Sequence, residues 1–345
     1  MIYSVELVQR TNIRYQEAAL HLCRCELLSM LSALQISAPV KAERLGGIPF
    51  LTFECRELSP EELSILSRHS SLSLIAERQG DLLRPLLFPE AGYLPADLPE
   101  VLKYKGKTGV PFTRMMINIA LSLVPGALRD PRITLFDPLC GKGTSLFCAL
   151  QDGLNAVGLD RDERAIHEAA EYFARYLKYH QLKHTRRARS ETLRSGSLPV
   201  TEFLFSRDKE HYLAGDTRQL TLSTGDTEWS PALFRKKTAD VIVADLPYGI
   251  QHAPQGSQRT ETFQALLSRS LPAWRQALRA DGALAISFNT YTLPTRTVQE
   301  SLRRAGWTVC DQPPLTGLQH EVEQAVVRDV VFAINNKGGS PHDSE

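Results

Sequence analysis

The sequence predicts an α/β protein: a mostly parallel sheet covered by helices on both faces, with a smaller α+β domain before it. From residue 104 onward, short apolar runs alternate with amphipathic stretches, which is typical of a parallel sheet. Before residue 90, strand-like and helix-like segments also occur. A proline-rich stretch, with Pro85, Pro89, Pro95 and Pro99, separates the two regions and indicates a domain boundary.

The composition is that of a soluble globular protein. The chain has 345 residues, 43% of them hydrophobic and 23% charged, a length that suits about two domains. No apolar stretch approaches the ~18 residues of a membrane-spanning helix, and the start, MIYSVELVQR, lacks the layout of a signal peptide. We therefore expect a cytoplasmic protein without membrane contact.

The six cysteines predict free thiols and no metal site. They form no C-x-x-C pair and are too few for a secreted disulfide scaffold. His21, Cys23 and Cys25 lie close together in sequence, but a spacing of two directs alternate side chains to different faces of a helix.

The first 90 residues predict alternating strands and helices. Strands are expected over 3–8, 47–55 and 71–77. Apolar positions recur at helical spacing over 15–34, and Ser59 with Glu62 predicts a capped helix start. We place an α+β domain, suited to RNA or partner binding, over 1–90 and a linker over 91–103.

The remaining residues predict the larger domain, over 104–336, and a disordered tail over 337–345. Its expected strands are ITLFD (133–137), AVGLD (156–160), HYLAGD (211–216), DVIVAD (240–245), ALAISF (283–288), WTVCD (307–311) and VVFAI (330–334). One apolar face over 162–180 predicts a helix packed on this sheet. The basic segment 183–194 lacks such a face and predicts an exposed insertion.

A glycine-rich turn follows the first of these strands. In Asp137-Pro138-Leu139-Cys140-Gly141-Lys142-Gly143-Thr144, the two glycines allow the backbone to turn sharply and approach a ligand. The spacing matches neither G-x-G-x-x-G nor a P-loop. Asp160 ends the next strand, where a carboxylate accepts the hydroxyls of a ribose. The pattern predicts a site for an adenosine-bearing molecule.

A second turn, Asp245-Leu246-Pro247-Tyr248-Gly249, predicts where the chemistry occurs. An exocyclic base amine is a poor nucleophile because its lone pair is delocalised into the ring. The Asp245 carboxylate and the Leu246 carbonyl can accept both amine hydrogens and aim the lone pair at an electrophile. Pro247 would stiffen the turn, and Tyr248 could stack on a base. A tight turn with a buried tyrosine is the alternative.

The glycine turn resembles motif I of class I S-adenosylmethionine methyltransferases, which reads D-P-x-C-G-x-G-T in amino-methylating RNA and DNA enzymes. The resemblance implies a Rossmann-like, doubly wound sheet with one antiparallel strand, and S-adenosylmethionine as cofactor. It implies cofactor contacts from the loop (Asp137, Pro138, Cys140, Gly141, Gly143, Thr144) to the methionine part, from Asp160 and Arg161 at the ribose, and from Asp216 and Thr217 at the adenine amine. Helix capping is the alternative for Asp216.

The second turn resembles the [D/N/S]-P-P-[Y/F/W] signature of amino-methyltransferases, with Leu246 in place of the first proline. D-[L/M]-P-[F/Y]-G variants are similar to those of RNA guanine amino-methylases related to THUMP-containing enzymes. The segment KYKGKTGVPFTRMMINIALSL resembles the helix before motif I in the tRNA guanine-10 N2-methyltransferase group, which implies cofactor contacts from Phe112 and Thr113. The expected activity is therefore methylation of the N2 amine of guanosine in structured RNA, with tRNA as the leading substrate.

The charge distribution places nucleic-acid contact in the same part of the chain. Residues 1–100 hold 9 Lys/Arg against 13 Asp/Glu, which leaves 31 against 26 for the rest. Lys183, Arg186, Arg187 and Arg189 are predicted to contact phosphates, with a solvated face as the alternative. Two other functions stay open, DNA adenine amino-methylation and non-catalytic RNA binding, as does the need for a small activating protein partner.

Overall fold

The computed structural model describes residues 1–8, 13–87, 92–102, 104, 107–193, 196–234, 238–246, 262–323 and 326–336. The expected tail, and Pro247 and Tyr248 of the second turn, lie outside these residues. No helix among the described residues combines the length and apolar character needed to cross a bilayer. The same residues contain no group of three or more His, Cys, Asp or Glu side chains that could hold a metal ion.

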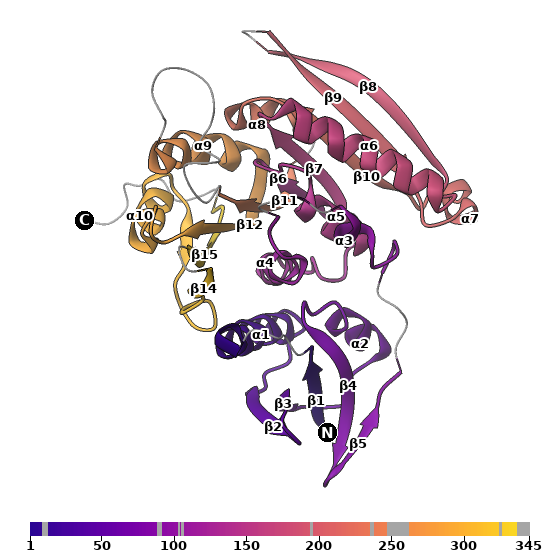
Figure 1. Cartoon of the computed structure of the whole chain (residues 1–345), viewed down its shortest axis with the longest axis vertical. Helices are drawn as coiled ribbons and strands as arrows, with labels where there is room; N and C mark the ends of the chain where they lie inside the picture. The colour runs from indigo at the N-terminus through magenta and orange to yellow at the C-terminus, as the bar shows by residue number, and fades with distance from the viewer. Residues whose placement is uncertain are drawn as a thin grey trace.

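The N-terminal sheet is antiparallel, with strand order β2-β3-β1-β4-β5 (Figure 1). Its strands are β1 (Ile2–Leu7), β2 (Lys41–Leu45), β3 (Ile48–Glu54), β4 (Leu72–Gln79) and β5 (Leu82–Pro85). Helices α1 (Ile13–Ala33) and α2 (Pro60–Leu66) share its core. The predicted start of α2 is confirmed, because the Ser59 hydroxyl accepts from the Glu62 amide and the Glu62 carboxylate accepts from the Ser59 amide.

The second sheet has the strand order β13-β15-β12-β11-β6-β7-β10-β9-β8, with β14 paired to β15. Its strands are β6 (Thr134–Asp137), β7 (Asn155–Asp160), β8 (His184–Leu193), β9 (Gly196–Phe205), β10 (Arg218–Thr224), β11 (Ala239–Asp245), β12 (Leu278–Asn289), β13 (Thr308–Cys310), β14 (His320–Glu323) and β15 (Val326–Ile334). The central strands β12-β11-β6-β7-β10 are parallel, which confirms the predicted fold class. The expectation of one antiparallel strand is wrong, because β9 and β15 both run antiparallel to their neighbours and extend the sheet at its two ends.

Helices cover both faces of this sheet, as predicted. One face packs against α4 (Val110–Ser122), α5 (Thr144–Gln151) and α6 (Glu163–Tyr179), and the other against α8 (Ser230–Leu233), α9 (Phe263–Ala277) and α10 (Thr295–Arg304). On β11, Val241 and Val243 belong to the first core, whereas Ile242 and Ala244 belong to the second. Successive side chains point to opposite faces, so a strand buried on both sides is apolar throughout.

A buried polar contact joins the N-terminal unit to α4, which lies between the second sheet and α1 (Figure 1). The Asn118 amide donates to a Glu26 carboxylate oxygen at 2.7 Å and to the Arg68 carbonyl at 2.9 Å. Glu26 also accepts from the Ser70 amide at 2.8 Å. Glu26 and Asn118 are both buried, so these bonds hold α1 and α4 in one arrangement.

The segment predicted to be a linker packs against the larger fold. It contains α3 (Leu98–Val101), and its side chains Leu94 and Leu98 are buried. The Tyr172 hydroxyl of α6 donates to the Leu98 carbonyl at 2.6 Å, and the Tyr93 amide donates to the Gln151 carbonyl of α5 at 2.7 Å. Residues 92–102 are thus held by α5 and α6, and the boundaries assigned to the domains stay a prediction.

Two segments fold differently from the prediction. HYLAGD is not a strand: α7 (Lys209–Leu213) covers its first half, and β10 begins only at Arg218. Leu220 and Leu222 are the buried residues that fix β10 in the sheet. The basic segment 183–194 is exposed, as expected, but it forms β8, the edge strand of a long β8–β9 ribbon (Figure 1). Backbone pairing to β9 forms this strand without an apolar stripe.

Candidate cofactor and substrate site

Three of the four predicted aspartates end neighbouring parallel strands. Asp137 ends β6, Asp160 ends β7 and Asp245 ends β11, and β6 lies between the other two strands. The register aligns Asp137 with Gly158, two residues before Asp160. The carboxylates of Asp160 and Asp245 both raise the pKa of Asp137 by charge repulsion. The structure therefore brings the three side chains together at the carboxyl edge of the sheet, where open α/β sheets bind ligands.

The glycine turn has the backbone conformation that its sequence predicts. Gly141 and Gly143 have φ values of 50° and 86°, which residues with a Cβ rarely adopt. The Gly143 amide donates to the Cys140 carbonyl at 2.8 Å and closes the turn, and α5 begins at Thr144. The first amides of α5 thus face the strand ends and provide a partly positive site for an anionic group.

Asp137 stabilises the glycine turn through two hydrogen bonds. Its carboxylate accepts from the Leu139 amide at 3.0 Å and from the Ser145 hydroxyl. Burial raises the pKa of Asp137 to about 7, although these two hydrogen bonds oppose the rise. The side chain is only 4% exposed, so Asp137 organises the loop more than it presents a charge to solvent.

Asp160, at the end of the neighbouring strand β7, stabilises the glycine turn through hydrogen bonds. One carboxylate oxygen accepts from the Gly141 amide at 2.7 Å, and the other accepts from the Asp162 amide at 2.9 Å. Burial raises the pKa of Asp160, against the effect of these bonds. A carboxylate offers about four acceptor positions, so Asp160 can hold the turn and still accept ribose hydroxyls.

Close packing under the glycine turn explains why Gly158 and Cys140 are small residues. A Cβ at Gly158 would lie 2.4 Å from Leu146 Cδ1 and 2.8 Å from Cys140 Sγ, so only glycine fits there. Cys140 is buried, and burial raises the pKa of its thiol. Its described contacts are those of a packing residue, and its predicted cofactor contact is untested.

Asp216 does not lie where the prediction placed it. It precedes β10 and so stands at the amino end of that strand, whereas Asp137, Asp160 and Asp245 lie at carboxyl ends. There it pairs with Arg218 at 2.6 Å, and its carbonyl accepts from the Tyr93 hydroxyl at 2.9 Å. Asp216 and the adjacent Thr217 are therefore structural at the edge opposite the site, because β10 begins seven residues later than HYLAGD predicts.

Asp226 occupies the position intended for Asp216. It follows the carboxyl end of β10, and the preceding Gly225 amide donates to the Asp160 carbonyl at 2.9 Å. Its carboxylate accepts from Arg269 at 2.6 Å and from the Glu228 amide at 3.0 Å, and Arg161 lies 3.5 Å away. Burial alone would raise the pKa of Asp226, but these partners lower it below the usual value. We therefore propose that Asp226 accepts from the adenine amine.

Substitution of Asp226 tests this assignment. We expect Asp226→Ala to weaken binding of S-adenosylmethionine about tenfold or more, by the 1–3 kcal/mol of a lost charged acceptor. Asp216→Ala should leave that affinity within about twofold. Isothermal titration calorimetry on both variants measures the difference. Equal affinities for the two variants would remove Asp226 from the adenine site.

Asp245 and Leu246 stand at the next strand end. Asp245 is half-buried and pairs in register with Ser287 of β12, and the Leu246 amide donates to the Ser287 carbonyl at 2.9 Å. The Thr108 hydroxyl, from the segment before α4, donates to the Asp245 carboxylate. The sequence gave no sign of this last contact, because the two residues are 137 positions apart.

The start of α4 and the segment before it make contacts that differ from the prediction. Phe112 is buried against His320 of β14, at 5.1 Å between ring centroids, and Arg328 of β15 lies over its ring. Thr113 donates to the Gly109 carbonyl at 3.3 Å. Neither contact involves the glycine turn, and the cofactor contacts of both residues stay untested. Tyr104 is the residue that touches the turn, with its hydroxyl 2.8 Å from Thr144 Oγ1.

The predicted RNA-binding residues lie together on β8 and beside it. Arg186 pairs with Glu171 at 2.8 Å, and Arg189 pairs with Glu202 at 2.9 Å. Among the described residues, no ion pair involves Lys183 or Arg187, and both are exposed. Charged residues on an edge strand also disfavour pairing with other chains, and Arg186 and Arg189 are both held in ion pairs here. Lys183 and Arg187 are better placed for phosphate contact.

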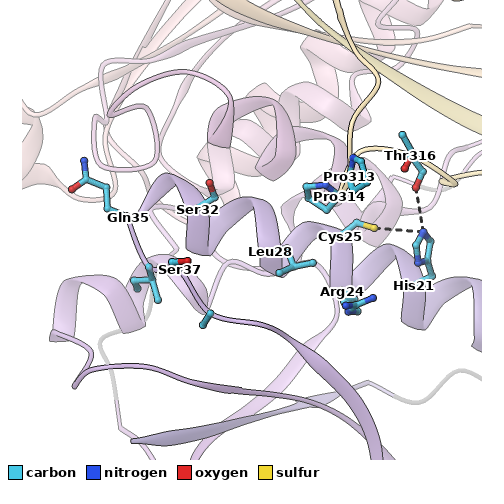
Figure 2. Close-up of a pocket in the computed structure, with 12 residues that line it drawn as sticks. His21, Arg24, Cys25, Leu28, Ser32, Gln35, Ser37, Pro313, Pro314 and Thr316 are labelled. Atoms are coloured by element: carbon cyan, nitrogen blue, oxygen red, sulfur yellow. Dashed lines mark hydrogen bonds between the residues drawn. The ribbon is translucent and has the colours of Figure 1, made fainter.

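A separate groove lies between α1 and residues 313–316, as Figure 2 shows. It has a volume of about 700 Å³, and its lining includes His21, Arg24 and Cys25. His21 Nε2 lies 3.4 Å from the Thr316 carbonyl and 3.6 Å from Cys25 Sγ. None of the residues predicted for cofactor or substrate lines this groove, so it is not the site built by the strand ends.

The described residues fit an adenosine-bearing sulfonium cofactor. The glycine turn offers a backbone cradle and the first turn of a helix, and Asp160 and Asp226 offer acceptors at successive strand ends. Asp226 is the functional candidate that the sequence prediction missed. The alternating run RQLTLST before Gly225-Asp226 was the signal that could have identified it.

Comparison with known proteins agrees with this fold. Residues 112–309 match the RMKL-like methyltransferase domain family. No curated protein matches the chain. Similar solved structures include TrmN from Thermus thermophilus (16% identity, 86% of this chain and 59% of that chain, TM-score 0.36) and an rRNA methylase from Streptococcus thermophilus (13%, 68% and 100%, 0.35). Another is magnesium protoporphyrin IX methyltransferase from Synechocystis, with bound SAM (13%, 67% and 87%, 0.38).

Proposed function

Because the chain belongs to the RMKL-like methyltransferase domain family, and so uses S-adenosylmethionine, we propose that it methylates the exocyclic N2 amine of guanosine in structured RNA, with tRNA as the leading substrate. The observation that carries the proposal is the position of Asp245 and Leu246. They end β11, next to the strand that leads into the glycine turn. An amine held by these two residues would face the cofactor's methionine end.

The chemistry requires acceptors and no strong base. S-adenosylmethionine, when bound, supplies an electrophilic methyl group on a sulfonium. The Asp245 carboxylate and the Leu246 carbonyl accept the two amine hydrogens, which directs the nitrogen lone pair at the methyl carbon. The nitrogen–carbon bond forms as the carbon–sulfur bond breaks, and one amine proton then leaves to the carboxylate or to water.

Leu246 supports catalysis although it departs from the usual proline. Its amide donates to the Ser287 carbonyl, a bond that proline could not make, and its side chain is 2% exposed. The bond to β12 fixes the peptide between Asp245 and Leu246, which directly precedes the carbonyl that is needed. This observation favours an enzyme over the non-catalytic alternative.

An exposed aromatic side chain favours a substrate with accessible bases. Tyr291 is 69% exposed and follows Asn289, the last residue of β12, at the same edge as Asp245. The Asn289 side chain accepts from the Tyr291 amide at 3.2 Å and fixes this turn. Aromatic rings stack on unpaired bases, a contact worth about 1–3 kcal/mol per base. We assign Tyr291 to RNA contact beside the target guanosine.

A methylation assay with defined nucleic acids tests the proposal. The protein is incubated with labelled S-adenosylmethionine and either unmodified tRNA transcripts or duplex DNA, and the products are digested for nucleoside analysis. We expect N2-methylguanosine from RNA. N6-methyladenine from DNA would establish the alternative enzyme, and cofactor binding without transfer to any RNA would establish the non-catalytic reading.

A further inference from the structure

The Thr108 hydroxyl donates to Asp245, the carboxylate that the proposed function assigns to the target amine. Thr108 and Asp245 are both half-buried. A hydrogen bond to an ionised acceptor is about twice as strong as one between neutral groups, so it can fix a side chain. We propose that Thr108 is a positioning residue for methyl transfer, which holds the Asp245 carboxylate in the orientation that accepts an amine hydrogen of the base.

The strand pairing of Asp245 holds its main chain. Asp245 pairs with Ser287, and the next amide, that of Leu246, donates to the Ser287 carbonyl. These contacts do not involve the Asp245 side chain. The second side-chain torsion of aspartate rotates broadly, so the Thr108 donor, which comes from outside the strand, restricts the orientation of the carboxylate.

The segment that carries Thr108 is anchored on both sides. On one side, the Tyr104 hydroxyl lies 2.8 Å from Thr144 Oγ1, at the start of α5. The Lys107 amide donates to the Tyr104 carbonyl at 3.3 Å. On the other side, Gly109 caps α4 and its carbonyl accepts from the Thr113 amide at 3.1 Å. Described residues just before α4 therefore contact both the start of α5, through Tyr104, and Asp245, through Thr108.

Thr108 and the base amine can be bound at the same time. A carboxylate has about four acceptor positions, and the Thr108 hydroxyl acts on Asp245 only as a donor. Thr108 therefore does not compete for the amine hydrogens. Loss of its hydroxyl should impair the reacting geometry and leave binding of the RNA and cofactor intact, since neither ligand depends on this bond.

This inference rests on the proposed function, and steady-state kinetics on the full chain test it. Thr108→Val removes the hydroxyl at nearly constant shape and should lower kcat about 10- to 100-fold, the scale of a misplaced reacting group. The KM for RNA and the Kd for S-adenosylmethionine should stay within about twofold. Thr108→Ser, which keeps a donor, should retain kcat within about threefold. Thermal unfolding checks that both variants fold.

A matched control removes the same kind of bond elsewhere. Thr52 of β3 donates to Glu43 of β2 in the N-terminal sheet, so Thr52→Val should leave kcat unchanged. The inference is overturned if Thr108→Val keeps wild-type kcat, if the valine and serine variants lose it equally, or if the loss lies wholly in cofactor affinity. In those cases RNA methylation by the wild type still supports the proposed function. A wild-type protein that methylates no RNA overturns both.

Discussion

Asp245→Ala is expected to reduce methyl transfer to RNA about 10³-fold or more while the Kd for S-adenosylmethionine stays within about twofold. The substitution removes the carboxylate, so one amine hydrogen loses its acceptor and the Thr108 hydroxyl loses its partner. Removal of one preorganised electrostatic contact typically costs 10²–10³ in kcat, and here two contacts fail together. Stopped assays of transfer and calorimetry of cofactor binding separate the two effects.

The same strand offers a control for this variant. Asp240 lies at the amino end of β11, where its carboxylate accepts from the Thr134 amide at 2.8 Å. Asp240→Ala removes the same functional group at the opposite edge of the sheet, so kcat should be unchanged in the folded variant. If Asp245→Ala and Asp240→Ala show equal transfer rates, Asp245 is not at the site of chemistry.

A pH-dependent loss of stability is expected from Asp137. Its pKa is about 7 in the folded protein, against an ordinary value of 3.8, because burial penalises the charged form. Folding therefore favours the protonated carboxyl, so this contribution is fully present below pH 4 and is lost as the pH rises through 7. The difference corresponds to roughly 4 kcal/mol over that window, since each pKa unit is about 1.4 kcal/mol.

Asp137→Asn measures this contribution directly. The asparagine side chain cannot ionise, and its amide can still bond to Ser145 while its oxygen accepts from Leu139. Urea unfolding of both proteins from pH 4 to pH 8 should give a free-energy difference that moves in favour of the variant by a few kcal/mol. A difference that does not change with pH would mean that Asp137 ionises as readily in the folded protein as in the unfolded chain.

Local sequence signals were sufficient for much of the fold. The capping box at Ser59 formed as predicted because both of its bonds lie within three residues. The same holds for the glycine turn, where φ values of 50° and 86° need no distant partner. Strands buried on both faces, such as β11 with its apolar run 241–244, were found at their observed positions.

Prediction failed where a short segment suited two structures or lacked apolar residues. HYLAGD contains three adjacent apolar residues, which fit one turn of helix as well as a strand, and α7 forms there. β8 has no buried residue, so only its pairing to β9, with buried Phe203 and Phe205, makes it a strand. The position of Asp216 was predicted wrongly for the same reason, because it depends on where β10 begins.

The sequence alone determined the fold class and the glycine turn, since backbone torsions and alternating burial are properties of neighbouring residues. Tertiary structure decided which groups meet at the strand ends. It placed Asp216 at the amino end of β10 and Asp226 after its carboxyl end, placed Tyr104 beside the start of α5, and brought Thr108 to Asp245 across 137 residues. Such contacts depend on the pairing of strands distant in the chain, which residue spacing does not encode.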